Sequence, residues 1–314
     1  MKEKPFILFN GQIFYDFEDV SLPINRAMIY GESLFTTFLF SGETPFYLTE
    51  HLERTYKGLE FLFGSGYITS QLYKNVWQSL NSAFKECNHD IDYSIRLTFF
   101  LKSFSRSFLP SEKEDLCFFI WVSPVKLSRE KLKSVSVRLA QTRRTPNEKP
   151  SFLKMGNYGE TLIELRKAKQ KGFEDVLFLD NKNSVKECST SNIFFVKGNK
   201  LVTPQLDSCL LEGITRRNFM KFWKFWGGIV TERKLALEEV KHFDAILLTN
   251  SIQLIRPCFQ IGDIKLKEKK ILDLNHLELF QNFYSYSKEN SDKELINYEK
   301  EKSRGCLSSL QEKI

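Results

Sequence analysis

Two residues could together carry covalent and electrostatic chemistry: a lysine at position 154 and a glutamate at position 187. Lys154 lies in FLKMGNYGETLIELRKA, between apolar residues and a Gly-Asn-Tyr turn that precedes a helical pattern. A lysine held in a dry site has a lowered pKa, so its amine can act as a nucleophile. Glu187 lies in VKECSTSNIFFV, after a predicted strand and turn, where a carboxylate could face a cationic ring nitrogen. Taken alone, such residues are more often solvated charges in a loop or at a strand edge.

Three further segments could bind an anion. LLEGITR places Ile214 and Thr215 at the start of a predicted helix, where free N–H groups and the helix dipole favour a phosphate. LLTNS ends an apolar strand at Ser251, and the carboxyl ends of strands often bind ligands. Arg54 lies on a predicted helix in LTEHLERTY, and a guanidinium suits a phosphate. Separately, these patterns are equally typical of a capped helix, a turn and a solvated helix face.

Both helices and strands must position these residues. The spacing of apolar residues predicts helices over residues 48–63 (with Thr49 as N-cap), 69–87, 160–171, 213–226 and 272–287. Short β-branched and apolar runs predict strands within 6–15 and over 34–41, 91–101, 116–122, 135–140, 175–180, 193–196, 200–203, 229–231 and 245–249. The helices are grouped rather than strictly alternating with strands, which indicates an α+β fold.

The chain length of 314 residues suits two domains. The polar stretch 123–134 is the predicted boundary, because linkers between domains are polar. It separates a smaller α+β N-terminal domain, residues 1–123, from a larger C-terminal domain, residues 124–287. Residues 288–314 are rich in Lys, Glu and Ser, and we expect a charged tail that adds little to the core.

Composition excludes several functional classes. The net charge is +7, but basic and acidic residues are interspersed and no nucleic-acid motif is present, so we expect no nucleic-acid partner. The six Cys form no CxxC pair and the four His have no metal-ligand spacing, so we expect reduced thiols and no metal site. No apolar run reaches the length of a transmembrane helix or a signal-peptide core, so we expect no membrane association and a cytoplasmic location.

Taken in order, the segments resemble a known family. NRAMIYGESLF and HLER precede Lys154, and VKECSTSNIFFVKGNKLVTP, LLEGITR and LLTNS follow it, with Glu187 33 residues after the lysine. This order resembles the fold-type IV enzymes that depend on pyridoxal 5′-phosphate (PLP): branched-chain and D-amino-acid aminotransferases and 4-amino-4-deoxychorismate lyase. The resemblance runs from about residue 6 to about residue 287 and is most specific over 154–216. It implies a two-domain architecture like that of D-amino-acid aminotransferase, a PLP cofactor, a small-molecule substrate and a homodimer.

The resemblance also implies roles for the candidate residues. Lys154 would form the internal aldimine with PLP and move protons, and Glu187 would keep the pyridine nitrogen protonated, which deepens the electron sink. The phosphate ligands would be Arg54, the backbone amides at Ile214 and Thr215, and the Ser251 hydroxyl.

Other roles are open to more than one residue. Tyr158 or its neighbour Asn157 would bond the ring hydroxyl of the cofactor. The candidates on the substrate side are Tyr30, Thr37, Arg96 and Arg106, with the two arginines as carboxylate binders.

Two features favour the lyase branch of the family. Its aminotransferases usually have Phe-Glu in the strand after the Tyr-Gly turn, whereas this chain has Phe35-Thr36-Thr37. The KMGN run that starts at Lys154 also resembles the lyases, although D-amino-acid aminotransferases have a similar run. The predicted function is therefore 4-amino-4-deoxychorismate lyase, which eliminates pyruvate to give 4-aminobenzoate for folate synthesis. The alternative is an amino-acid aminotransferase of the branched-chain or D-amino-acid type. A non-catalytic scaffold is disfavoured, because the lysine, the glutamate and the phosphate arginine are all retained.

Overall fold

The computed structural model describes residues 4–21, 24–102, 108, 115–127, 129–130, 132–145, 150–266 and 275–303, with side chains described up to Ser291. The chain divides into two compact units. The first comprises Met1–Lys126, Phe152–Asn157 and Lys288–Ile314, and the second comprises Leu127–Ser151 and Tyr158–Ser287. The predicted division placed the lysine segment in the C-terminal domain, whereas its contacts group it with the N-terminal unit.

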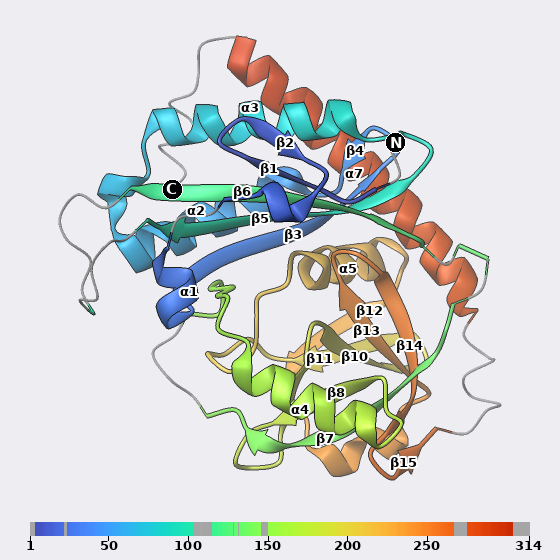
Figure 1. The fold of residues 1–314 in the computed structure, drawn as a ribbon. Helices are drawn as coiled ribbons and strands as arrows, with labels where there is room; N and C mark the ends of the chain where they lie inside the picture. Colours follow the sequence, from blue (N-terminus) through green and yellow to red (C-terminus); the bar gives the residue numbers. More distant parts are fainter. Residues whose placement is uncertain are drawn as a thin grey trace. The chain divides into compact units, whose positions relative to one another are not determined.

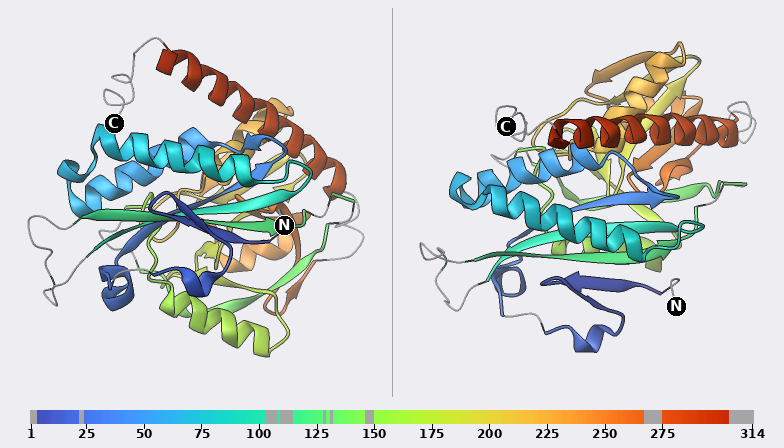
Figure 2. Two further views of the ribbon diagram at one scale, coloured as in Figure 1. Left: turned by 45° about the horizontal axis from the view of Figure 1, so that its top comes forward. Right: turned by 90° about the horizontal axis from the view of Figure 1, so that it is seen from above.

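The first unit contains a six-stranded sheet in the order β2-β1-β6-β5-β3-β4. Its strands are β1 (Phe6–Phe9), β2 (Gln12–Phe14), β3 (Ser33–Ser41), β4 (Thr44–Pro45), β5 (Asp92–Leu101) and β6 (Leu116–Val125). Its other elements are η1 (Phe17–Asp19), α1 (Arg26–Tyr30), α2 (Leu48–Phe63), η2 (Ser65–Tyr67) and α3 (Ser70–Glu86). Helices α2 and α3 lie side by side on one face of this sheet (Figures 1 and 2).

Side-chain alternation along β3 explains which residues meet the helices. Leu34, Phe38 and Phe40 belong to the core that the sheet shares with α2 and α3. Successive side chains of a strand point to opposite faces, so Phe35 and Thr37 lie on the other face. One face of β3 therefore builds the core with α2 and α3, and the opposite face carries Phe35 and Thr37.

The helix starts of this unit test the predicted caps. Helix α2 has the predicted bounds, but its N-cap is Tyr47, in the left-handed region with φ 52°. The prediction of Thr49 as N-cap was wrong, because the turn after β4 brings the chain into the helix two residues earlier. Thr69 caps α3, and its side chain accepts a hydrogen bond of 3.1 Å from the amide of Leu72.

The second unit is built on a nine-stranded mixed sheet, in which β12-β11-β10-β13-β14-β7-β8-β9 follow one another and β15 pairs with β14. Its strands are β7 (Val135–Arg143), β8 (Asp175–Leu179), β9 (Val185–Cys188), β10 (Asn192–Lys197), β11 (Lys200–Pro204), β12 (Ile229–Arg233), β13 (Ala245–Asn250), β14 (Leu254–Ile261) and β15 (Ile264–Lys265). Its helices are α4 (Gly159–Gln170), α5 (Ile214–Phe225) and η3 (Leu237–His242). Helix α4 packs on β7 and β8, and α5 packs on β12 and β13 (Figure 1).

The last described helix, α7 (His276–Ser303), is longer than predicted. The prediction ended it at residue 287 and treated the rest as a tail with little packing. Instead the helix continues, Ser291 is buried, and its hydroxyl accepts a 2.9 Å hydrogen bond from the amide of Tyr47. In the described part of the chain, no helix combines the length and apolarity that a membrane crossing requires.

Candidate active site

Backbone pairing along β3 holds Lys154 in the first unit. The amide of Phe35 donates to the carbonyl of Lys154 at 2.9 Å, and the amide of Gly156 donates to the carbonyl of Ser33 at 2.8 Å. β4 is only two residues long and pairs with the far end of β3, which leaves this edge open for the lysine segment. Leu153 is buried in the core of the same unit, so this side chain anchors the segment in addition to its backbone bonds.

A close approach explains the glycine that follows the lysine. A Cβ added at Gly156 would lie 2.1 Å from the hydroxyl oxygen of Ser33. A side chain here would force the Ser33 hydroxyl to move, so glycine suits the position as the segment pairs with β3. The KMGN run therefore has a packing reason that does not depend on which reaction the protein catalyses.

The amine of Lys154 and the guanidinium of Arg96 meet the same aromatic ring. The lysine Nζ lies 4.9 Å from the centroid of the Phe35 ring, and the guanidinium carbon of Arg96 lies 3.5 Å from it. Each contact is a cation–π interaction, which contributes about 0.5–1 kcal/mol at an exposed site and more when dry. Arg96 also donates from Nε to the Thr98 hydroxyl at 3.2 Å. Thr37 is the direct cross-strand partner of Arg96, so the sheet face that carries Phe35 gathers three of the predicted site residues.

The remaining residues predicted on the substrate side are Tyr30 and Arg106. Tyr30 ends α1, and its ring lies 4.9 Å from the guanidinium carbon of Arg26. The next residue, Gly31, packs against Asn157 of the lysine segment, because a Cβ added there would lie 3.3 Å from the Asn157 Cβ. Arg106 lies outside the described residues.

Arg54, the predicted phosphate arginine, projects from α2 toward β3. Its Nη2 donates to the hydroxyl of Thr36 at 3.3 Å, and that hydroxyl also lies 2.6 Å from Nδ1 of His51. Thr36 is fully buried on the helix-covered face of the sheet, whereas Thr37 lies on the opposite face. The two threonines are therefore not a functional pair, although they are adjacent in the sequence.

In the second unit, the Glu187 carboxylate on β9 is oriented by its neighbours. The amide of Leu211 donates to it at 2.8 Å, and the side-chain amide of Asn192 lies 3.4 Å from the same oxygen. Asn192 also donates to the carbonyl of Leu211 at 2.9 Å. A Cβ added at Gly213 would lie 2.1 Å from Oδ1 of Asn192, so glycine is needed where the loop passes this amide.

The predicted phosphate ligands of the second unit lie together at the start of α5. The N-cap of this helix is Gly213, and no side chain caps the helix. The first two residues of α5, Ile214 and Thr215, are buried, and the Thr215 hydroxyl donates to the Ser251 hydroxyl at 3.2 Å. An uncapped helix start with two adjacent hydroxyls is a donor set that suits an anion.

Tyr158 occupies the N-cap position of α4 in the second unit, and its side chain makes no capping bond. Its carbonyl accepts the amide of Leu162 at 2.9 Å, which starts the helix. The neighbouring Asn157 is exposed and ends the lysine segment of the first unit. The choice between these two residues as the partner of a ring hydroxyl remains a prediction.

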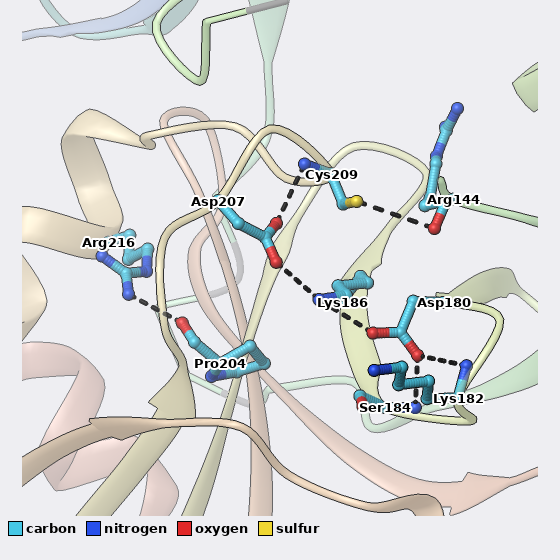
Figure 3. A network of polar contacts seen from close by, with 9 residues as sticks. All are labelled: Arg144, Asp180, Lys182, Ser184, Lys186, Pro204, Asp207, Cys209 and Arg216. Carbon is cyan, nitrogen blue, oxygen red and sulfur yellow. Dashed lines mark hydrogen bonds and ion pairs between the residues drawn. The ribbon is translucent and has the colours of Figure 1, made fainter. Parts of the chain in front are cut away.

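The buried Lys186 holds the loop that carries Leu211 through an ion pair with Asp207. Sequence patterns alone did not reveal this contact. Lys186 is 4% exposed and bonds Asp207 at 2.6 Å and Asp180 at 3.2 Å (Figure 3). Asp207 in turn accepts the amide of Cys209 at 2.9 Å, and the Cys209 thiol lies 3.6 Å from the carbonyl of Arg144. Lys186 lies between the strands predicted over 175–180 and 193–196, so no strand pattern marked it as an inward-facing residue.

The charges of this network shift each other's ionisation. Burial acts to lower the pKa of Lys186, but the hydrogen bond and charge of Asp207, and then those of Asp180, outweigh it and raise the pKa above its usual value. Burial acts to raise the pKa of Asp180, but the amides of Ser184 and Lys182 and the Lys186 amine together lower it. Both groups are therefore charged at neutral pH.

Comparison with known proteins defines the class. Residues 33–261 match the family model of amino-transferase class IV, so the chain belongs to the class IV aminotransferase family. The match covers most of both units and confirms the family predicted from the order of the motifs. Among the residues described, no cluster of His, Cys, Asp and Glu could hold a metal ion.

Individual relatives are named as branched-chain aminotransferases. The chain is 44% identical over 96 residues to branched-chain-amino-acid aminotransferase 2 of Bacillus subtilis, which covers 29% of this chain and 26% of that protein. It is 35% identical over 134 residues to the mitochondrial branched-chain amino acid aminotransferase 1 of Humulus lupulus, covering 42% of this chain and 33% of that protein. The chain thus matches about a quarter to a third of the length of these relatives.

Solved structures of the family share the fold. The branched-chain amino acid aminotransferase of Escherichia coli superposes with a TM-score of 0.75 at 23% identity, covering 84% of this chain and 88% of that one. An aminotransferase from Brucella abortus, solved bound to PLP, gives a TM-score of 0.77 at 21% identity and covers 91% and 99% of the two chains. These likenesses confirm the predicted two-domain α+β architecture.

Proposed function

We propose that this protein is a PLP-dependent aminotransferase that transfers the amino group of a branched-chain amino acid to a 2-oxo acid. The family match carries this proposal, because residues 33–261 include Lys154, Glu187, Arg54 and the start of α5. The names of the curated relatives supply the substrate class. The same names move the proposal from the predicted lyase to the aminotransferase alternative.

The residues present fit a phosphorylated pyridine cofactor. The uncapped start of α5, with the Thr215 and Ser251 hydroxyls 3.2 Å apart, offers donors for a phosphate. Arg54 offers a guanidinium, and Glu187 offers a carboxylate oriented by a backbone amide. Bound PLP supplies an electron sink for the negative charge that develops at the substrate Cα.

Each protein group then has a defined task. The Lys154 amine, placed over the Phe35 ring by its backbone bonds to β3, would hold the cofactor covalently and move a proton at the substrate Cα. The Glu187 carboxylate would keep the pyridine nitrogen protonated. Arg96 on the same sheet face as Phe35 is the described candidate for binding the substrate carboxylate.

Two residues that favoured a lyase, Thr36 and Gly156, make contacts that do not depend on the reaction. Thr36 faces the helices and contacts Arg54 and His51, so it does not select a substrate. Gly156 of the KMGN run leaves room for the Ser33 hydroxyl. The contacts of Thr36 and Gly156 therefore do not distinguish between the two reactions.

A paired assay tests the proposal. Purified protein supplied with PLP is given leucine, isoleucine or valine with 2-oxoglutarate, and glutamate is measured. In parallel it is given 4-amino-4-deoxychorismate alone, and pyruvate is measured, with Lys154→Ala as the inactive control in both arms. We expect glutamate with the branched-chain substrates. Pyruvate from the second arm without glutamate in the first would establish the lyase instead.

We further propose that the protein forms a homodimer, as the family resemblance implies. In its support, α1 and its surroundings expose apolar side chains: Met28 is 63% exposed and Phe108 is 82% exposed. Arg26 of α1 joins Phe108 to this helix, because its Nη2 donates to the Phe108 carbonyl at 2.7 Å. An apolar patch of this kind is typical of a surface that a second protein chain covers.

A further inference from the structure

One buried hydroxyl joins the predicted phosphate arginine to a buried histidine. Thr36 on β3 lies 3.3 Å from Nη2 of Arg54 and 2.6 Å from Nδ1 of His51, and both partners come from α2. Thr36 has no exposed surface, and His51 is 1% exposed. All three residues belong to the first unit, and the contacts span the packed interface between β3 and α2.

One arrangement of donors and acceptors satisfies both contacts at once. Arginine has only donors, so the Thr36 oxygen must accept from Arg54. The hydroxyl proton of Thr36 is then free to donate to Nδ1 of a neutral His51 that carries its own proton on Nε2. In this arrangement the histidine fixes the direction of the threonine proton, and the threonine lone pair is left pointing at the guanidinium.

We infer that Thr36, oriented by His51, is a positioning residue that holds the Arg54 guanidinium ready for the phosphate of the cofactor. The inference rests on the proposed function, because it takes PLP as the ligand of Arg54. An unrestrained arginine loses rotamer entropy when it is immobilised. A guanidinium already held by a buried hydroxyl has less of this freedom left to lose when the phosphate binds.

Thr36 is a polar residue at a position of β3 where the neighbouring inward side chains are apolar. Its neighbours Leu34 and Phe38 on the same strand face are apolar core residues, so an apolar side chain would pack there equally well. A polar residue at a fully buried site is costly unless its hydrogen bonds are made. The hydroxyl is thus explained by its two partners rather than by packing.

The test compares PLP with pyridoxal, which lacks the phosphate. Dissociation constants of both are measured by absorbance titration for the wild-type protein and for Thr36→Val, Thr36→Ser and Arg54→Gln. Valine has the shape of threonine without the hydroxyl, and serine retains the hydroxyl. We expect Thr36→Val to weaken PLP binding about tenfold and pyridoxal binding less than about twofold, because a hydrogen bond to a charged group is lost. Thr36→Ser should retain most of the PLP affinity.

A purely structural role of Thr36 would give a different result. If Thr36→Val weakened PLP and pyridoxal equally, or left both unchanged, the positioning role would be wrong. Should Thr36→Val fail to fold, the pair His51→Leu and His51→Asn takes its place, since the Asn oxygen can accept at the position of Nδ1 and leucine cannot. The same phosphate-specific loss is expected for His51→Leu alone.

The controls separate this inference from the proposed function. A wild-type protein that binds no PLP would overturn both. A wild-type protein that binds PLP, with a phosphate-specific loss in Arg54→Gln but none in Thr36→Val, would overturn the positioning role and leave the proposed function intact.

Discussion

The amide of Leu211 donates a 2.8 Å hydrogen bond to the carboxylate of Glu187. Leu211 lies three residues before Ile214, the first residue of α5, so the loop that orients the carboxylate also leads into the helix start. Asn192 bonds the carbonyl of the same Leu211, which fixes the loop from its other side. Within the second unit, the proposed partner of the pyridine nitrogen and the proposed phosphate donors are therefore positioned by one short segment.

Replacing Glu187 by glutamine should separate the charge from the geometry. The glutamine oxygen can still accept the Leu211 amide, but the negative charge that would keep the pyridine nitrogen protonated is lost. We expect kcat of the amino transfer to fall by at least about tenfold, which corresponds to about 1.4 kcal/mol in the barrier. The melting temperature should change by less than about 2 °C, because the hydrogen bond is retained. An unchanged kcat in the folded, PLP-loaded variant would contradict the role of the carboxylate.

Gly213→Ala should destabilise the second unit mainly through its contact with Asn192, with a smaller contribution from the Arg216 Cβ at 3.3 Å. The backbone of Gly213 has φ −71° and ψ 133°, which any residue adopts, so strain is not the cause. The new Cβ would lie 2.1 Å from Oδ1 of Asn192. We expect a loss of about 1–3 kcal/mol in the free energy of unfolding, measured in urea. With Asn192→Ala as background the added loss should become much smaller, and fully additive effects would contradict this cause.

Much of the secondary structure follows from local patterns. Helix α2 has the predicted bounds, because Tyr56 and Leu59 recur at helical spacing and both are buried. Strand β14 was missed, because Pro257 in its middle is unfavourable to a strand. The burial of Ser291 was missed as well, since a small polar residue among Lys and Glu gives no core signal.

In the candidate site as well, the sequence predicts some features and not others. The order of the motifs predicts the family, which the family model confirms, and the roles of the individual site residues stay predictions. It does not predict that Thr36 contacts Arg54, because these residues lie 18 positions apart and meet only where α2 packs on β3. Nor does it predict Asn192 as a partner of Leu211, because these residues lie 19 positions apart and meet only in the folded unit.

Lys186→Met should destabilise the protein in a pH-dependent way. The variant leaves Asp180 and Asp207 without the amine that both contact. We expect a loss of about 2 kcal/mol at pH 7, below the range for fully buried pairs because both carboxylates keep some contact with solvent. The pKa of Lys186 is raised above 10.5, so its contribution is present below that value and is lost as the pH rises through the raised pKa.

In acid, the stability contribution of Asp180 changes with pH in the opposite direction. The pKa of Asp180 is lowered below 3.8, so its contribution is present above that value and is lost as the pH falls through the lowered pKa. The difference between wild type and Lys186→Met should therefore stay level from about pH 5 to 9 and shrink in acid below 3.8. Urea unfolding across this pH range measures the difference.

Lys197→Met is the matched control, since Lys197 pairs with Asp244 at the surface and should contribute less than about 0.5 kcal/mol. Equal losses in both variants would show that burial of Lys186 has no energetic consequence.

Met28→Asp should weaken the proposed homodimer. Met28 is 63% exposed on α1, and a carboxylate there would be desolvated if a second copy covered this surface. We expect light scattering after size exclusion to give twice the chain mass of 36.9 kDa for the wild type and a shift toward the single-chain mass for the variant. Phe225→Asp is the control, because Phe225 is 76% exposed at the end of α5 and its change should leave the mass unaltered. A wild-type protein that elutes at the single-chain mass at micromolar concentration would rule out the dimer. A dimer that only Phe225→Asp disrupts would move the interface from α1 to the end of α5.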